Sequence, residues 1–178
     1  TCTECGRCQS QCPAWNTEKP LSPKLMIMNL RDHAFTKAPY ITAVQKKNEG
    51  KNTEMGEVDE EVLATLSEKV QAEVARPLVG PREFDPHRAT DGYDAAGHRS
   101  HEGAVIDYDA LWSCTTCGAC VNQCPVDIEH IDHFLDMRRY QVMIETEFPS
   151  ELNLTFKNLE NKGNPWGMNA SKRNDWIS

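Results

Sequence analysis

The sequence lacks any long apolar run, any excess of positive charge and any cysteine outside two short segments. Its mean hydropathy is −0.62, and no run approaches the roughly 20 apolar residues that span a bilayer, so we expect no transmembrane segment in this stretch. The net charge of −8 argues against nucleic acid as a partner, because proteins that bind a phosphate backbone gather Lys and Arg on one face. With 39% hydrophobic and 26% charged residues in 178 positions, the composition is typical of one folded domain or two small halves that share a core.

The chain also lacks a signal segment and an initiating methionine, because it opens with Thr1 directly before its first motif. The second motif is preceded by residues 107–112, whose sequence DYDALW predicts a capped helical turn. The first motif has only Thr1 in front of it. We therefore interpret the chain as a piece of a longer polypeptide.

All eight cysteines occur in two runs with one spacing, C-x2-C-x2-C-x3-C-P. This spacing is that of bacterial ferredoxins, in which three thiolates bind one 4Fe-4S cluster and the fourth binds the other cluster. Two intervening residues let a tight loop curl around one face of a cluster, and the proline then redirects the chain. The runs are Cys2, Cys5, Cys8 and Cys12, followed by Pro13, and Cys114, Cys117, Cys120 and Cys124, followed by Pro125.

The crossing of the fourth ligand assigns each sulfur to a cluster and makes both clusters depend on both ends of the chain. The tripeptide Gln-Cys-Pro and the dipeptides Cys-Thr and Cys-Gly recur at an offset of 112 residues. The runs therefore form an internal repeat, which predicts two half-sites related by a pseudo-twofold axis. The predicted ligands are Cys2, Cys5, Cys8 and Cys124 for cluster 1, and Cys114, Cys117, Cys120 and Cys12 for cluster 2.

Two other uses of eight cysteines compete with this interpretation. Four disulfides would indicate a small secreted scaffold, but such proteins are short and scatter their cysteines. Zinc needs four ligands for each ion and favours pairs of C-x2-C, which leaves the third cysteine of each run unexplained. Two 4Fe-4S clusters explain every cysteine and agree with a reducing compartment.

The residues after the first run predict a helix that begins at Pro23, with Ser22 as its N-cap, and reaches about Phe35. We expect Pro39 to end it. Five side chains are available to face a core, namely Leu25, Met26, Met28, Leu30 and Phe35.

A second helix is predicted over residues 59–75, with three acidic residues at its positively charged start. Its apolar stripe repeats every four residues and comprises Val62, Leu66, Val70 and Val74.

Residues 76–103 contain Pro, Gly, Asp and Arg with almost no apolar period, which indicates a surface loop. The loop contains three histidines, and no regular element sets their spacing. We expect solvated side chains, not a metal site, at His87, His98 and His101.

A long helix is predicted from about Asp127 to Glu147, with Ile128, Ile131, Leu135 and Val142 at helical intervals. His130 and His133 lie three residues apart in it. Because acidic residues are interleaved with them, we expect both histidines on a solvated or partner-facing edge.

Beyond Pro149, residues 163–167 (GNPWG) predict a turn. Trp166 and Trp176 are candidates to anchor this tail. We expect one dicluster domain over 1–178, in which 1–40 contain the first motif and a helix, 41–106 a helix and the long loop, and 107–178 the second motif, a helix and the tail.

The two runs, together with residues 111–117 (LWSCTTC) and 161–167 (NKGNPWG), resemble the iron-sulfur segment of heterodisulfide-reductase-related oxidoreductases over nearly the whole chain. Within that family the chain is most similar to the membrane enzymes that oxidise reduced electron-transfer flavoprotein and deliver the electrons to menaquinone, a step of fatty-acid β-oxidation. The resemblance implies a mainly α fold, an α-helical ferredoxin.

The same resemblance implies parts of the protein outside this chain. These would be a membrane domain with haem b, which reduces quinone, and cysteine-rich domains that hold a further cluster. No Cys-Cys-Gly sequence occurs in the 178 residues, so the segment itself would be an electron relay without a substrate site. It would lie on the cytoplasmic side of the plasma membrane, attached through other parts of the chain.

Two further hypotheses compete for the function. The segment resembles the iron-sulfur subunits of glycerol-3-phosphate dehydrogenase, glycolate oxidase and heterodisulfide reductase, which share the relay and differ in the donor. In the other hypothesis the clusters are structural or act as a redox sensor. Paired motifs argue against that role, because a sensor needs one cluster whereas a relay gains from two.

Overall fold

The computed structural model describes residues 2–48, 58–80 and 103–177, and these form helices and one isolated β-bridge but no strand. The predicted mainly α class is therefore confirmed. The chain divides into two compact units, Thr1–Met137 (unit 1) and Arg138–Ser178 (unit 2), each described by itself. Within the described ranges, no helix is both long and apolar enough to cross a membrane.

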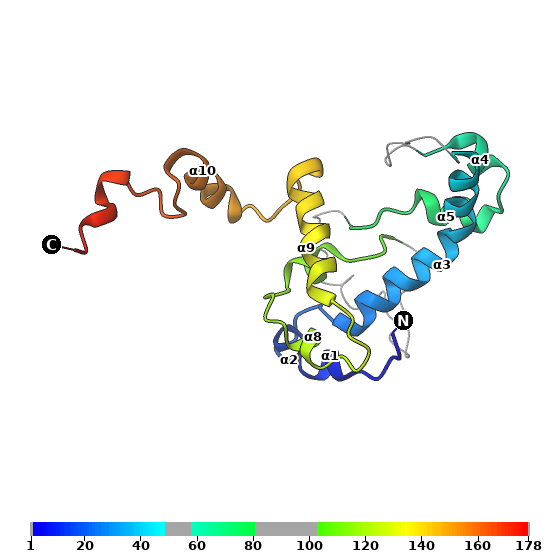
Figure 1. The fold of residues 1–178 in the computed structure, drawn as a ribbon, viewed down its shortest axis with the longest axis horizontal. Helices are drawn as coiled ribbons and strands as arrows, with labels where there is room; N and C mark the ends of the chain where they lie inside the picture. The colour runs from blue at the N-terminus through cyan, green and yellow to red at the C-terminus, as the bar shows by residue number, and fades with distance from the viewer. Residues whose placement is uncertain (1, 49–57, 81–102, 178) are drawn as a thin grey trace. The chain divides into compact units, whose positions relative to one another are not determined.

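Three one-turn helices gather at one end of unit 1, where both cysteine runs lie. They are α1 (Arg7–Ser10), α2 (Pro13–Asn16) and α8 (Ala119–Asn122). Figure 1 shows them side by side, and α1 contacts both of the others. Because α1 and α8 belong to runs 112 positions apart, this contact brings the repeats together.

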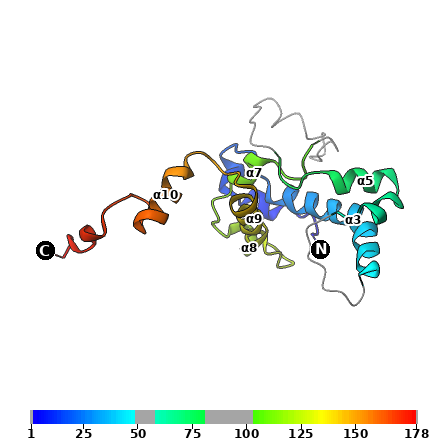
Figure 2. The ribbon, with the colours of Figure 1, turned by 90° about the horizontal axis from the view of Figure 1, so that it is seen from above.

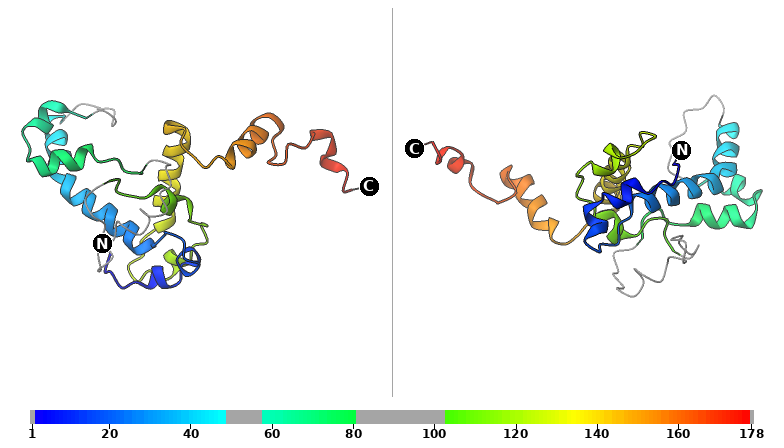
Figure 3. Two further views of the ribbon diagram at one scale, coloured as in Figure 1. Left: turned by 180° about the vertical axis from the view of Figure 1, so that it is seen from behind. Right: turned by 90° about the horizontal axis from the view of Figure 1, so that it is seen from below.

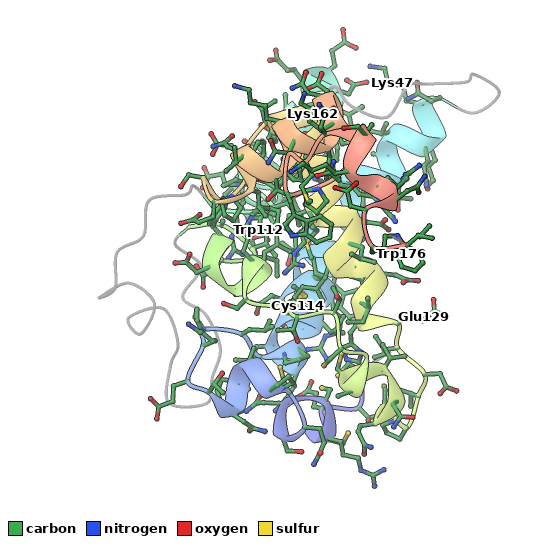
Figure 4. All side chains as sticks on the ribbon, turned by 90° about the vertical axis from the view of Figure 1, so that its left-hand side faces the viewer. Lys47, Trp112, Cys114, Glu129, Lys162 and Trp176 are labelled. Carbon is green, nitrogen blue, oxygen red and sulfur yellow. The ribbon has the colours of Figure 1, made fainter. Side chains whose placement is uncertain are left out.

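The longest described helix, α3 (Pro23–Lys47), leads away from the cysteine end of unit 1. Its predicted start is confirmed, because Pro23 is its first residue and the backbone N–H of Leu25 donates to Ser22 Oγ over 3.2 Å. Figure 3 shows from two sides how this helix, blue to cyan, reaches the end formed by α4 and α5. Figure 4 places Lys47 and Cys114 at well-separated levels of the unit.

The predicted end of this helix at Pro39 is wrong, because α3 continues to Lys47 with Pro39 inside it. An internal proline removes one backbone hydrogen bond and costs about 3 kcal/mol. Tyr40 is buried directly after the proline, and Val44 packs against the same apolar cluster one turn later. Burial of this segment against α5 offsets the cost of the proline.

The expected core positions of α3 are confirmed in part. Met26 and Met28 are 4% and 3% exposed, and Leu30 packs against the main core. Phe35 is 67% exposed, so its expected place in the core is wrong. The buried positions of the helix continue at Tyr40 instead.

The single helix predicted over 59–75 is two helices, α4 (Glu60–Ala64) and α5 (Glu68–Ala75). Gln71 reaches back from α5, and its Nε2 donates to the carbonyls of Leu63 and Leu66 over 3.2 and 2.9 Å. These bonds satisfy carbonyls that the end of α4 would leave without partners.

The predicted apolar stripe of this region is nevertheless confirmed. Val70 and Val74 are buried with Tyr40, and Val62 and Leu66 pack against them. Figure 2 shows α5 lying along the second half of α3. The Tyr40 hydroxyl accepts a hydrogen bond from the backbone N–H of Asp59 over 2.8 Å, which fixes the start of α4 on α3.

The main core of unit 1 lies beside the cysteine end. It includes the predicted helical turn before the second run, which is α7 (Tyr108–Trp112). An isolated parallel bridge pairs Val79 with Ile106 and holds the two ends of the predicted loop together. The buried members of the core are Cys12, Ala14, Leu21, Met26, Val105, Ile106, Leu111, Phe134 and Met137.

The long helix predicted over 127–147 begins later and changes character near its end. Its α-helical part is α9 (His130–Tyr140), followed by the π-helical turn η1 (Gln141–Glu145). Asp127 has a φ of 53°, so the chain turns there before the helix can start. The buried positions of α9 are His130, Phe134 and Met137, not the predicted apolar set.

Unit 2 contains η1, then α10 (Leu152–Lys162) and the 3-10 helix η2 (Ala170–Asn174). The predicted turn is confirmed, because Gly163 ends α10 with a φ of 66°. Trp166 and Trp176 are 77% and 81% exposed within the described part of the chain.

Candidate metal centre

Four cysteines from both runs line one hollow in unit 1. The wall of this first cavity includes Cys2, Cys5, Cys8 and Cys124. Three of these sulfurs come from the first run and one from the second. This is the set predicted for cluster 1.

The other four cysteines line a second hollow in unit 1. The wall of this second cavity includes Cys114, Cys117, Cys120 and Cys12. This is the set of ligands predicted for cluster 2. Each of the eight cysteines therefore lines one of the two cavities, and none lines both.

The two runs share their backbone geometry as well as their spacing. The N–H of Glu4 donates to Cys2 Sγ over 3.3 Å, and 112 positions later the N–H of Thr116 donates to Cys114 Sγ over 3.4 Å. Both donors have a positive φ, 59° for Glu4 and 53° for Thr116. The tight curl thus turns a backbone N–H toward the first sulfur of each run.

A glycine opens the one-turn helix in each run. Gly6 and Gly118 have φ values of 78° and 79°, in the left-handed region that glycine adopts without strain. The helix that follows brings the third cysteine, Cys8 or Cys120, into the interior. The repeat is therefore an equivalence of local backbone as well as of sequence.

The runs differ after the fourth cysteine. Cys12 is buried and is followed at once by α2, with Pro13 as its first residue. Cys124 is half-buried, and its Sγ accepts a hydrogen bond from the N–H of Ile128 over 3.3 Å. The sulfur that crosses into the first cavity is therefore more accessible than the one that crosses into the second.

Burial affects the protonation of the third cysteine in each run. It raises the pKa of the Cys120 thiol to about 11. Burial also raises the pKa of Cys8, and the nearby sulfurs of Cys2, Cys5 and Cys124 add to that rise. Ligands must be deprotonated, so a metal group that binds here displaces protons from both thiols.

His130 is not on the solvated edge that the sequence predicted. It is 1% exposed and lines the first cavity. Its Nδ1 lies 2.8 Å from the carbonyl of Ile128, which can only accept, so Nδ1 carries a hydrogen. Burial lowers the pKa of His130. The prediction failed because His130 lies four and seven residues before the buried Phe134 and Met137, and so belongs to the buried face of α9.

The other histidine predictions have different outcomes. His133 is exposed, as expected. His87, His98 and His101 lie outside the described residues. No sequence pattern indicated Lys24, which lines the first cavity from the start of α3.

Each cavity suits a 4Fe-4S cluster by its donors. Four thiolates are the usual ligands of such a cluster, and backbone N–H groups that bond to the sulfurs are part of how a protein adjusts its potential. The first and second cavities each supply four cysteine sulfurs and one such N–H from the start of a run.

Comparison with protein families gives one match that covers most of the chain. The model of the 4Fe-4S dicluster domain matches residues 1–128, which include both cysteine runs. No solved structure matches the chain significantly.

Several curated proteins are similar along nearly the whole chain. The EtfAB:quinone oxidoreductase of Syntrophomonas wolfei is 34% identical over 99% of this chain and 21% of its own length. The probable iron-sulfur-binding oxidoreductase FadF of Bacillus subtilis is 34% identical over 98% of this chain and 22% of its own length. A probable membrane-anchored ferredoxin of Chromohalobacter salexigens is 29% identical over 99% of this chain and 21% of its own length. The chain thus spans about a fifth of these relatives.

Proposed function

Because this chain belongs to the 4Fe-4S dicluster domain family, we propose that it is the electron-relay segment of a larger oxidoreductase. Cys2, Cys5, Cys8 and Cys124 would hold cluster 1 in the first cavity. Cys114, Cys117, Cys120 and Cys12 would hold cluster 2 in the second cavity. Each cluster supplies a one-electron couple when bound. The protein contributes the position, the burial and the hydrogen bonds that adjust that couple.

The observation that carries the proposal is how close the two cavities lie. Pro23 lines the second cavity and the next residue, Lys24, lines the first. On α9, His130 lines the first cavity and Ile131 the second. Consecutive residues of two helices therefore line different cavities. Two clusters bound in these cavities would lie at the short spacing that a relay needs. A single structural or sensing cluster would have no use for this arrangement.

The donor and acceptor follow from the family resemblance. We propose that electrons enter from reduced electron-transfer flavoprotein and continue toward menaquinone, as a step of fatty-acid β-oxidation. The name of one relative, the EtfAB:quinone oxidoreductase, supports this donor and a quinone acceptor. A haem b domain and a further cysteine-bound cluster would lie elsewhere in the protein. Attachment to the cytoplasmic side of the plasma membrane would also come from those parts.

The test is electron transfer in the full-length protein of which this chain is a part. The protein is placed in lipid nanodiscs with menaquinone and mixed anaerobically with reduced electron-transfer flavoprotein. Rapid freeze-quench EPR is expected to show reduction of two 4Fe-4S centres in this segment before menaquinol forms. Replacing Cys5 and Cys117 together with Ser is expected to remove both centres and to reduce menaquinol formation at least a hundredfold.

The matched control is Ser10→Ala with Asn122→Ala, which changes exposed residues of α1 and α8 and spares every sulfur. It should retain both centres and the wild-type rate. The donor assignment is wrong if reduced flavoprotein leaves the centres oxidised while a glycerol-3-phosphate or glycolate dehydrogenase subunit reduces them. The relay itself is wrong if the Cys5 and Cys117 variant still forms menaquinol at the wild-type rate.

A further inference from the structure

The walls of the two cavities differ, although their cysteine runs are alike. In the first cavity the wall includes Lys24 and His130. In the second cavity the side chains that come from the corresponding regions of α9 and the segment before α3 are apolar, namely Leu21, Ile131 and Phe134. The residue after the first cysteine is Thr in both walls, Thr3 and Thr115. The difference therefore arises outside the repeat.

Lys24 is the one charged residue among the described residues that line the two cavities. It is half-buried as the second residue of α3, so solvent screens its charge less than that of a surface lysine. A cluster becomes more negative by one charge when it is reduced. A cation in the wall therefore stabilises the reduced form in the first cavity.

His130 and Cys124 act in the same direction. The His130 imidazole is a buried polar ring, held in place by its bond to the Ile128 carbonyl, where the second cavity has the phenyl ring of Phe134. Cys124 is half-buried whereas its counterpart Cys12 is 7% exposed. Polar groups and solvent near a cluster favour the form with more negative charge.

Negative groups near the first cavity do not cancel this effect. Arg31 pairs with both Glu4 and Asp32 over 2.8 Å, and these two carboxylates are 46% and 56% exposed, so solvent screens the negative charge that remains. Asp127 and Glu129 flank Ile128, and both are exposed, so solvent screens them. Lys24 therefore dominates the difference in charge between the cavities.

From these differences we infer that the cluster in the first cavity has the higher reduction potential and that Lys24 sets this order. This inference rests on the proposed function, because it requires a cluster in each cavity. One electron then passes downhill from the reduced cluster in the second cavity, which is oxidised, to the oxidised cluster in the first, which is reduced. No proton or co-reactant is needed. The second cavity faces the donor in this sequence of transfer, and the first faces the acceptor.

The test is a redox titration of the full-length protein, followed by EPR under nitrogen. The Cys117→Ser variant removes a ligand of the second cavity and identifies the signal that belongs to the first. That remaining signal is expected to be the one of higher potential. Lys24→Met is expected to lower the reduced-to-oxidised ratio of the first-cavity cluster at a fixed potential at least tenfold, which is 59 mV for a one-electron couple. Lys24→Arg, which keeps the positive charge, should have the wild-type ratio.

Two matched controls test the specificity of these changes. Lys46→Met removes an exposed charge near the far end of the same helix and should shift neither reduction potential. His130→Leu should lower the reduction potential of the first-cavity cluster by less than Lys24→Met does. His133→Leu, at an exposed position three residues later, should leave both reduction potentials unchanged.

The inference is overturned if Lys24→Met does not change the reduction potential of the first-cavity cluster, or if that potential is the lower of the two in the wild type. Iron analysis separates this failure from that of the proposed function. About eight irons and two signals, with a first-cavity potential that Lys24→Met does not change or that is the lower of the two, would overturn the inference alone. A wild-type protein with a single signal or without iron would overturn the proposed function.

Discussion

At the scale of single residues, the site depends on which cavity the fourth cysteine of each run faces. Cys124 lines the first cavity, whose other three sulfurs come from the first run. Cys12 lines the second cavity in the same reciprocal way. The crossed ligand assignment remains a proposal, and pairs of substitutions can distinguish it from an uncrossed one.

Replacing Cys12 and Cys117 with Ser removes two ligands of the same cluster if the fourth cysteine crosses. The protein should then keep about four of about eight irons, because the first cavity retains all its ligands. Replacing Cys12 and Cys5 removes one ligand from each cluster and should leave almost no iron. Iron and acid-labile sulfide analysis of both anaerobic proteins measures this difference. If the fourth cysteine does not cross, the variant of Cys12 and Cys5 should keep about four irons, and the variant of Cys12 and Cys117 should keep almost none.

At the scale of elements, α5 is held against α3 by charge as well as by apolar contacts. Glu73 on α5 lies 2.6 Å from Nδ1 of His33 on α3 and 3.2 Å from Nη1 of Arg76. All three side chains are less than 15% exposed. Arg76 also donates to the carbonyls of Gly103 and Ala104 over 2.6 and 3.1 Å. This group connects α3, α5 and the chain that leads into the second run.

The pKa of Glu73 makes this connection sensitive to acid. Burial alone would raise the pKa, but the hydrogen bond from His33 and the charge of Arg76 outweigh it and hold the pKa below its ordinary value of 4.5. A carboxyl with a lowered pKa in the folded state stabilises the fold above its unfolded pKa, and this contribution is lost as the pH falls through the folded pKa.

Replacing Glu73 with Gln is therefore expected to destabilise α5 by about 1.5–3 kcal/mol at neutral pH, the usual contribution of hydrogen bonds to a charged group. The gap in stability between the variant and the wild type should be full above pH 4.5 and should disappear as the pH falls through the lowered pKa of the folded state, below which Glu73 is protonated in both states. Hydrogen exchange of the α5 amides, corrected for the intrinsic effect of pH, measures the gap. Glu68→Gln, at an exposed position of the same helix, should produce no gap. A gap that stays constant to pH 3 would contradict the role of the carboxylate.

At the scale of the whole molecule, the clusters would join segments that are distant along the chain. Cys2 and Cys114 begin runs 112 positions apart, and each cavity draws sulfurs from both runs. A bound cluster therefore acts as a cross-link that closes a long loop. The fold of unit 1 and the loading of iron should then depend on each other.

Removing the iron is expected to lower the free energy of unfolding of unit 1 by at least about 4 kcal/mol, which is the loop-closure contribution of one cross-link over about 100 residues. For a chain of this size the melting temperature should fall by roughly 10 °C or more. Circular dichroism under nitrogen, before and after treatment with an iron chelator, measures the change.

The control for the chelator is the variant in which Cys5 and Cys12 are both Ser. It should melt at the low temperature from the start and should not respond to the chelator. Equal melting temperatures for the loaded and the stripped wild type would show that the clusters do not hold the repeats together.

The sequence alone determined the features that depend on a few neighbouring residues. The spacing within each run predicted the tight curl between neighbouring cysteines, which turns a backbone N–H toward the first sulfur of each run. This curl is set by adjacent residues alone. The Ser22 cap and the Pro23 start of α3 were predictable for the same reason, since a cap bonds to a backbone N–H three residues away. The stripe of Val62, Leu66, Val70 and Val74 also follows from local periodicity.

Only the tertiary structure decided the features in which distant contacts outweigh local preference. Packing of Tyr40 and Val44 against α5 carries α3 through Pro39, against the local tendency of proline to end a helix. The turn at Asp127 delays the start of α9, and His130 lies on the buried face of that helix, in a cavity wall instead of in solvent. Lys24 shares the wall of the first cavity with Cys124 and Pro125 of the far run. A single sequence does not reveal such contacts, because they depend on residues about a hundred positions away.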